Sequence, residues 1–153
     1  MPGEEAPPGD GAGGDAESVV RRDRFSGGPA RGFLSSLAAD ERIFDADLAV
    51  DRAHVVMLAE QGILGDDVAG EILSALDAVE AAGHGALPDG EDVHEAIETA
   101  VIDRVGPDGG RMHTARSRND EVATCIRHRL REDVLDAAAA TVALREALVE
   151  VAS

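Results

Sequence analysis

The sequence contains no lysine, tryptophan or tyrosine, and only three phenylalanines and one cysteine among its 153 residues. With so few aromatic side chains, any core must be aliphatic. The single Cys125 excludes an internal disulfide, and its position in an apolar helical pattern is more typical of a small buried residue than of a nucleophile. No apolar run reaches the roughly 18 residues that a membrane-spanning helix needs. The first residues do not resemble a secretory leader, so we expect a cytoplasmic protein.

Positively charged residues are also scarce. The 14 basic residues are all arginine, and they stand against 31 acidic residues, which gives a formal net charge of −17. A hydrated acidic surface keeps proteins soluble in concentrated salt, so the composition predicts a halophilic source; an acid-rich coding bias is the alternative. Residues 59–76 could pass for a DNA-binding helix-turn-helix, but the second helix would carry acidic residues and no arginine. DNA binding depends on neutralising phosphates, so we expect no nucleic-acid partner.

The chain divides by composition into three parts. Gly, Pro and acidic residues dominate 1–18, which predicts a disordered tail. An N-terminal helical domain is expected over 19–112, and an anion-binding loop followed by the first long helix of a bundle over 113–153. Within the helical domain, apolar spacing, helix stops at Gly62 and at 106–110, and a helix cap at Asp66 predict helices over three ranges, 46–61, 67–82 and 92–105.

The last predicted helix is unusually long. Ser117 and Asp120 form a capping-box pattern, and apolar residues then recur at helical spacing to Val151. At 1.5 Å per residue, a helix over 118–151 is about 50 Å long, longer than a compact small domain is wide. The apolar stripe therefore predicts partners outside the chain, and the fold class is all-α. With no stop signal after it, we expect the sequence to break off in or after a helix of a larger bundle.

Six of the arginines lie between residues 111 and 131, where only Asp120 and Glu121 oppose them. Surface ion pairing explains Arg127, Arg129 and Arg131 adequately. The stretch "HTARSRND" at 113–120 differs because it precedes a helix N-terminus, which favours an anion. Its hydroxyls, amide and guanidinium groups predict a carboxylate- or phosphate-binding loop, although Ser117 could only cap the helix and Asn119 only close a turn. The candidate binding residues are Thr114, Arg116, Ser117, Arg118 and Asn119.

A metal site is not expected. The stretch "HEAIE" at 94–98 resembles the helix of zinc proteases, but Glu98 stands where the second histidine ligand would be, and no third ligand pattern follows.

Four stretches in order, "RFSGGP" (24–29), "MLAEQGIL" (57–64), "EDVHEAIE" (91–98) and "HTARSRND" (113–120), resemble the N-terminal part of the argininosuccinate lyase family of the fumarase/aspartase superfamily. The resemblance covers about residues 20–153. It implies a β-elimination that splits argininosuccinate into arginine and fumarate in arginine biosynthesis, without metal or organic cofactor. It also implies a homotetramer of long helices, with each active site assembled from three subunits.

The resemblance assigns roles by matching positions. Ser26 and Asn119 match substrate-binding residues, Ser117 and Arg118 are expected to contact the fumarate-side carboxylates, and His94 lies near the site beside Asp92. For His94, a structural histidine bonded to a neighbouring carboxylate is the equal alternative. The family's proton-transfer residues lie further along its sequence than residue 153. We therefore expect no catalytic residue in this chain and no lyase activity from it alone.

Some positions depart from the family's pattern. Ala30 replaces a frequent aspartate, Ala115 the usual glycine and Glu121 the usual glutamine. Glu121 is expected to add negative charge where a substrate carboxylate binds. A catalytically inactive fragment, or a structural remnant of the same scaffold, remains the alternative to an enzyme part.

Overall fold

The computed structural model describes residues 33–153, and these residues form helices and turns without a β-strand. The predicted all-α fold class is therefore confirmed for this part of the chain. The tail expected over 1–18 and the substrate contact expected of Ser26 lie outside the described residues. No helix between Phe33 and Ser153 combines the length and the apolar character that crossing a bilayer requires.

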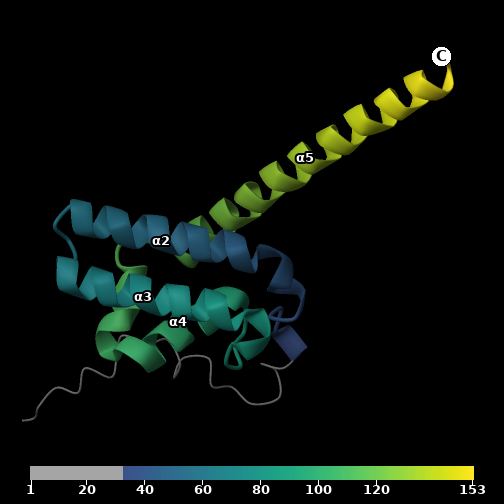
Figure 1. Ribbon diagram of the computed structural model, residues 1–153. Helices are drawn as coiled ribbons and strands as arrows, with labels where there is room; N and C mark the ends of the chain where they lie inside the picture. The colour runs from purple at the N-terminus through teal and green to yellow at the C-terminus, as the bar shows by residue number, and fades with distance from the viewer. Residues whose placement is uncertain (1–32) are drawn as a thin grey trace, which may run out of the picture.

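Helices α2 (Phe44–Glu60) and α3 (Asp66–Ala82) form an antiparallel hairpin (Figure 1). Apolar residues at helical spacing give each helix one buried face. Gly62, with φ 65°, adopts the left-handed conformation that ends the first helix, as predicted. The predicted cap at Asp66 is wrong by one position: Gly65 is the N-cap, and Asp66 is the first helical residue. Its carboxylate is still well placed to interact with the helix dipole.

Helix α4 (Val93–Val105) packs against α3, and its start is fixed by Asp92. The Asp92 Oδ1 accepts a hydrogen bond from the Glu95 backbone N–H at 2.7 Å, so Asp92 is the N-cap rather than the first helical residue. Gly106, with φ 87°, ends the helix where a stop was predicted. The segment that follows is not a simple loop but a 3₁₀ helix, η5 (Pro107–His113), whose Gly109 lies against the α4 backbone at Ile102.

Two shorter 3₁₀ helices, η3 (Ala39–Ile43) and η4 (His84–Ala86), connect the main elements. The core lies between α2, α3, α4 and η5 and is aliphatic except for Phe44, as the composition predicts. Its fully buried side chains include Leu48, Val55, Leu58, Ile72, Leu76, Val79, Val93, Ile97, Val101 and Met112.

Helix α5 (Arg118–Val151) runs for 34 residues and has the predicted bounds and the predicted Ser117–Asp120 capping box. Its first turns pack against α2, and the rest extends away from the helical body (Figure 1). The predicted apolar stripe consequently has no cover among the described residues. The exposed apolar side chains of α5 are Ile126, Leu130, Val134, Leu135, Val142, Leu144, Leu148, Val149 and Val151.

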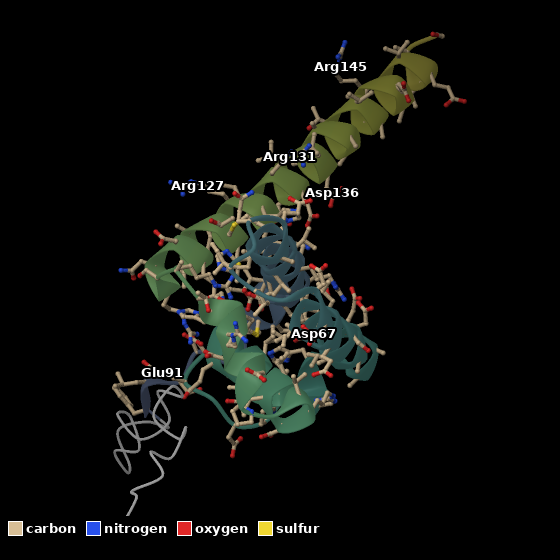
Figure 2. All side chains as sticks on the ribbon, turned by 90° about the vertical axis from the view of Figure 1, so that its left-hand side faces the viewer. Asp67, Glu91, Arg127, Arg131, Asp136 and Arg145 are labelled. Atoms are coloured by element: carbon tan, nitrogen blue, oxygen red, sulfur yellow. The ribbon has the colours of Figure 1, made fainter. Side chains whose placement is uncertain are left out.

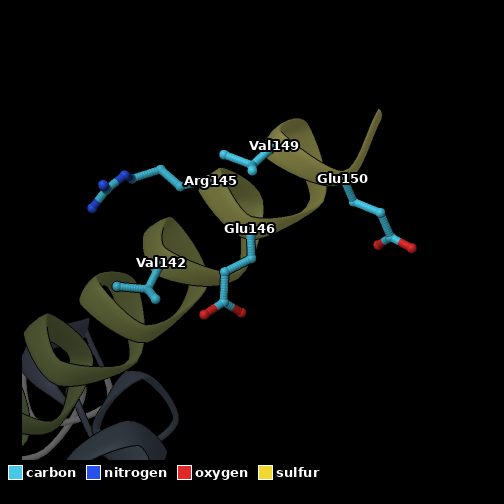
Figure 3. Close-up of a pocket in the computed structure, with 5 residues that line it drawn as sticks. All are labelled: Val142, Arg145, Glu146, Val149 and Glu150. Carbon is cyan, nitrogen blue, oxygen red and sulfur yellow. The ribbon is translucent and has the colours of Figure 1, made fainter. Parts of the chain in front are cut away.

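The end of α5 shows how this free part of the helix is built. Val142, Arg145, Glu146, Val149 and Glu150 are spaced three or four positions apart and line one shallow hollow on the helix surface (Figure 3). Apolar and charged side chains therefore share this side of the helix, and Leu130, Leu144 and Leu148 belong to another side. The division into domains at residue 112 stays a prediction.

Adjacent valines of α2 test the position of the core. Val55 is fully buried, whereas Val56 is 42% exposed. We expect Val55→Ala to lower the free energy of unfolding by about 2 kcal/mol, because it removes two buried methyl groups and leaves a cavity. Val56→Ala makes the same chemical change on the solvent side, so it should alter stability by less than about 0.5 kcal/mol. Denaturant unfolding followed by circular dichroism measures both, and equal losses would contradict the described core.

Candidate functional site

The predicted anion-binding residues lie in and beside the short loop that joins η5 to α5, residues 114–117. The loop backbone rests against α2, where the His54 Nε2 lies 2.8 Å from the Thr114 carbonyl oxygen. Ala115 has φ 60°, a left-handed conformation that side-chain-bearing residues rarely adopt. The structure thus brings Thr114, Arg116, Ser117, Arg118 and Asn119 to one end of α5, as their sequence neighbourhood requires.

The capping box already uses part of the donor set of the α5 N-terminus. The Ser117 hydroxyl oxygen accepts a hydrogen bond from the Asn119 N–H at 3.2 Å, and the Ser117 N–H donates to the Asp120 carboxylate at 3.2 Å. Ser117 therefore caps the helix, which was the structural alternative for this residue. The side chains of Ser117 and Asn119 are nevertheless exposed and accessible to a ligand.

Arg116 points inward rather than into solvent. Its guanidinium donates to the carboxylates of Asp51 and, at 2.8 Å, of Glu121, and the side chain is only 7% exposed. The nearby charges of Asp51 and Glu121 outweigh the cost of burial and raise the pKa of Arg116 further. Substrate binding by Arg116 stays a prediction, but in this structure its charge is occupied by carboxylates of the protein itself.

Arg118 links α5 to the start of α4. Its guanidinium lies 2.5 Å from the Asp92 carboxylate, 3.7 Å from that of Glu98 and 3.6 Å from that of Glu121. The Arg118 side chain is 20% exposed, so it is not sealed inside the protein as Arg116 is. Asp92 therefore has two contacts at this point: it caps α4 and it orients the guanidinium.

His94 is buried beneath this surface. Its Nδ1 lies 2.8 Å from the Asp47 carboxylate and 3.8 Å from that of Glu121. Burial by itself lowers the pKa of His94, but the carboxylates of Asp47, Glu121 and Asp92 together outweigh burial, so the pKa is raised above 6.5. The arrangement matches the structural alternative for His94, a histidine held by a neighbouring carboxylate.

Three carboxylates, those of Asp47, Asp51 and Glu121, are buried together under the loop. Burial is the main cause that raises the pKa values of Asp51 and Glu121, and the charge of Asp47 adds to it. Glu121 was expected to place negative charge where a substrate carboxylate binds. Instead it is buried and paired with Arg116, so much of its charge is compensated inside the protein.

The same cluster contains the donor types that metal ions prefer. Ligand atoms of Asp47, His94 and Cys125, and those of Asp47, Asp51 and Glu121, lie within 4.8 Å of one another. The buried Arg116 guanidinium, however, already supplies positive charge beside Asp51 and Glu121. Burial raises the pKa of the Cys125 thiol, which donates to Asp47 at 3.2 Å, so the thiolate that binds metals is disfavoured. The geometry favours an internally neutralised network.

Sequence reasoning missed the α2 side of this site. Asp47, Asp51 and His54 lie three or four positions apart, so one stripe of α2 carries all of them toward the loop. A usable signal was present, because polar residues fall there among the buried Leu48, Val55 and Leu58. A groove of about 320 Å³ also runs between α2 and α5, lined by Val50, Ala53, His54, Met57, Arg116, Asp120, Glu121 and Thr124.

The three arginines further along α5 were expected to form surface ion pairs. Arg129 does, since its guanidinium lies 2.7 Å from the Asp133 carboxylate and 3.7 Å from that of Glu132. Arg127 and Arg131 are exposed on the same helix (Figure 2). These residues lie apart from the buried network, so they belong to the helix surface rather than to the candidate site.

No protein-family model matches the chain. A protein named argininosuccinate lyase from Natronomonas pharaonis is 77% identical over 142 residues, which cover 91% of this chain and 29% of the relative. Proteins of the same name from Haloarcula marismortui and Halobacterium salinarum are 74% and 71% identical over 89% and 92% of this chain. The chain thus spans less than a third of the length of these relatives. The relatives are haloarchaeal, which agrees with the halophilic source that the lysine-free, acidic composition predicts.

The buried network makes stability depend on pH, and His94 sets the direction near neutrality. A raised pKa means that the folded state binds the proton more tightly than the unfolded chain does. The contribution of His94 is therefore complete below pH 6.5 and is lost as the pH rises through the raised pKa. Asp51 and Glu121, whose pKa values are also raised, act in the same direction at their own pKa values.

We expect the free energy of unfolding to fall as the pH rises above 6.5, and His94→Gln to flatten this slope. The measurement is denaturant unfolding at a series of pH values and constant salt. His128→Gln is the matched control, because His128 lies on α5 with 40% of its side chain exposed. If the two variants retain the same slope as the parent chain, the raised pKa of His94 is not its source.

Proposed function

Since the chain is homologous to the N-terminal portion of argininosuccinate lyase, we propose that it supplies substrate-binding residues for the β-elimination of argininosuccinate to arginine and fumarate. The observation that carries the proposal is the set of donors at the start of α5, where Ser117 and Asn119 are exposed, Arg118 is partly exposed, and the preceding loop is held against the helical body. As the resemblance implies, the reaction belongs to arginine biosynthesis and uses no metal or organic cofactor, and the protein is cytoplasmic.

The chemistry of the elimination explains why such donors are needed. Removing the proton next to a carboxylate moves negative charge onto that carboxylate, so donors aimed at it stabilise the transition state more than the ground state. We assign this task to Arg118, Ser117 and Asn119, with Thr114 at the edge of the loop. The start of a long helix adds a favourable dipole.

The residues around these donors have supporting parts in the proposal. Asp92 orients the Arg118 guanidinium at 2.5 Å. His94 lies beneath, held by Asp47. We expect Arg116 to contribute less to substrate binding than the sequence predicts, because its guanidinium is paired with the carboxylates of Asp51 and Glu121. Ser26 is included among the binding residues only because its position matches a substrate-binding serine of the family. The proton-transfer groups are expected in the part of the relatives that this chain does not span.

The uncovered stripe of α5 supports a homotetramer assembled through long helices. Leu130, Leu144 and Leu148 are each more than half exposed and fall on the stripe with helical spacing. Because exposed apolar rows of this length mark association surfaces, a bundle of such helices would bury them.

Fumarate release tests the assignment of roles. We expect no rise in fumarate absorbance when this chain alone is given argininosuccinate in molar-range salt. We expect a rise when it is mixed with the remaining portion of the Natronomonas pharaonis relative. In that mixture, Asn119→Ala should slow the reaction about a hundredfold, as the loss of one transition-state donor does. Arg131→Gln, an exposed change further along α5, is the control and should leave the rate unchanged.

Two outcomes would contradict the proposal. Fumarate formed by the chain alone would mean that a proton-transfer group lies within it. A soluble, folded mixture that forms no fumarate would favour a structural remnant of the scaffold over an enzyme part.

A separate prediction concerns the association surface. Replacing Leu130, Leu144 and Leu148 together by Gln should shift the chain from a tetramer to a monomer, because burial of each leucine contributes about 1.5–3 kcal/mol. Light scattering after size-exclusion chromatography measures the mass. Arg127→Gln, Arg131→Gln and Arg145→Gln together form the control on exposed charged positions of α5. A parent chain that is monomeric at high concentration would contradict assembly through this stripe.

A further inference from the structure

Helix α2 contacts the loop through two side chains that lie three positions apart, Asp51 and His54. His54 reaches the backbone of the loop, with Nε2 2.8 Å from the Thr114 carbonyl oxygen. Asp51 reaches a side chain two residues further on, the buried guanidinium of Arg116. A single turn of α2 thus holds both neighbours of Ala115.

Ala115 has a backbone conformation that must be restrained by its surroundings. Its φ of 60° places it in the left-handed region, which is unfavourable for a residue with a Cβ. Such a conformation persists only where the surrounding structure enforces it. Asp51 and His54 provide that constraint, because they restrain the carbonyl before Ala115 and the side chain after it.

The position of the donors depends on this conformation. Ser117 directly follows Arg116 and is the N-cap of α5, so its capping box sets the direction of the first turn of that helix. If the peptide around Ala115 relaxed, the loop would approach Ser117 from another direction, and the side chains of Ser117 and Asn119 would turn with it. Small displacements of binding groups are costly in sites that act by orientation.

The chemistry of the His54 contact is unambiguous. A carbonyl oxygen only accepts, so the His54 Nε2 must carry the hydrogen and donate it. His54 is half-buried at the surface, whereas Asp51 is almost fully buried. Losing the His54 bond should therefore loosen the loop without unfolding the protein, while breaking the buried Asp51 pair would endanger the fold itself.

We propose that His54 is a positioning residue of the anion-binding loop: together with Asp51 it locks residues 114–116 in the conformation that presents Ser117, Arg118 and Asn119 to a carboxylate ligand. The proposal rests on the proposed function for the identity of the ligand, and on the loop geometry alone for the role of His54.

The test compares His54→Ala and His54→Gln in the full chain. A glutamine side-chain amide can donate to the Thr114 carbonyl in place of Nε2, whereas alanine cannot. Amide hydrogen exchange of residues 115–119 and a titration with argininosuccinate, both followed by nuclear magnetic resonance, report on the loop and on binding. His84→Ala is the matched control, because the His84 Nε2 makes the same type of contact, 2.9 Å from the Leu37 carbonyl oxygen.

We expect His54→Ala to speed loop exchange and to weaken argininosuccinate binding, each by about five- to tenfold, the usual effect of one lost hydrogen bond. His54→Gln should restore both to within about twofold. His84→Ala should leave both unchanged. The melting temperature of His54→Ala should stay within about 3 °C of the parent, which separates positioning from general destabilisation.

The outcomes distinguish this inference from the proposed function. Unchanged exchange in His54→Ala would overturn the positioning role, whatever the ligand does. Faster exchange with unchanged binding would overturn its relevance to the site. If the parent chain does not bind argininosuccinate but loop exchange still responds to His54→Ala and recovers in His54→Gln, the positioning role stands and the assignment of the ligand falls.

Discussion

The carboxylates of Asp47, Asp51 and Glu121 are buried together, and the arrangement of the candidate site depends on how that charge is neutralised. Isolated carboxylates cannot remain ionised in an interior without cations and hydrogen bonds. The chain supplies Arg116 from the loop and His94 from α4. Because these cations come from different elements, neutralising the acids also joins α2, α4 and α5 at one point.

This constraint explains why the loop is less simple than a helix N-terminus with basic neighbours. An arginine that is paired with two buried carboxylates has less charge left to attract a ligand, and in this structure Arg116 ties the loop to α2 through Asp51. Arg118, also held by carboxylates but partly exposed, lies at the boundary between the network and solvent. In an acidic protein that is expected to work in salt, buried pairs have an advantage, because mobile ions screen them much less than surface pairs.

Much of the fold could be predicted from the sequence because local signals fix helices. The bounds of α5 follow from the Ser117 capping box and from unbroken helical spacing, and Gly62 and Gly106 end helices where only glycine adopts the required φ readily. The error at Asp66 has the same local origin, since an acidic residue can serve either as the cap or in the first turn. The 3₁₀ helix η5 was missed because its glycines indicate a turn, while its conformation depends on packing against α4.

The site was less predictable because its decisive contacts cross between elements. The spacing within "HTARSRND" identifies the loop, but nothing in it shows that Arg116 turns inward to Asp51, 65 residues earlier. Glu121 was misjudged for the same reason, since its neighbours in space include His94 and Arg116 as well as its neighbours in sequence. Sequence patterns report the face of one helix, whereas pairing requires knowing which faces meet.

Helix α5 connects this site to the proposed association surface, and its two halves are held differently. The N-terminal half is anchored through Glu121, through the Cys125 contact with Asp47, and through Asp133, which lies 3.2 Å from Arg42. The uncovered apolar stripe begins in this half, at Ile126 and Leu130, and continues through the later turns, which have no such anchors among the described residues. Because the anchors lie near the N-terminal end, the loop geometry can be set within this chain before any partner helix packs against the stripe. If the complete site is assembled from several chains, the loop at 114–117 and the start of α5 would therefore be in place before association. Association would then add further side chains to the site without changing the loop conformation.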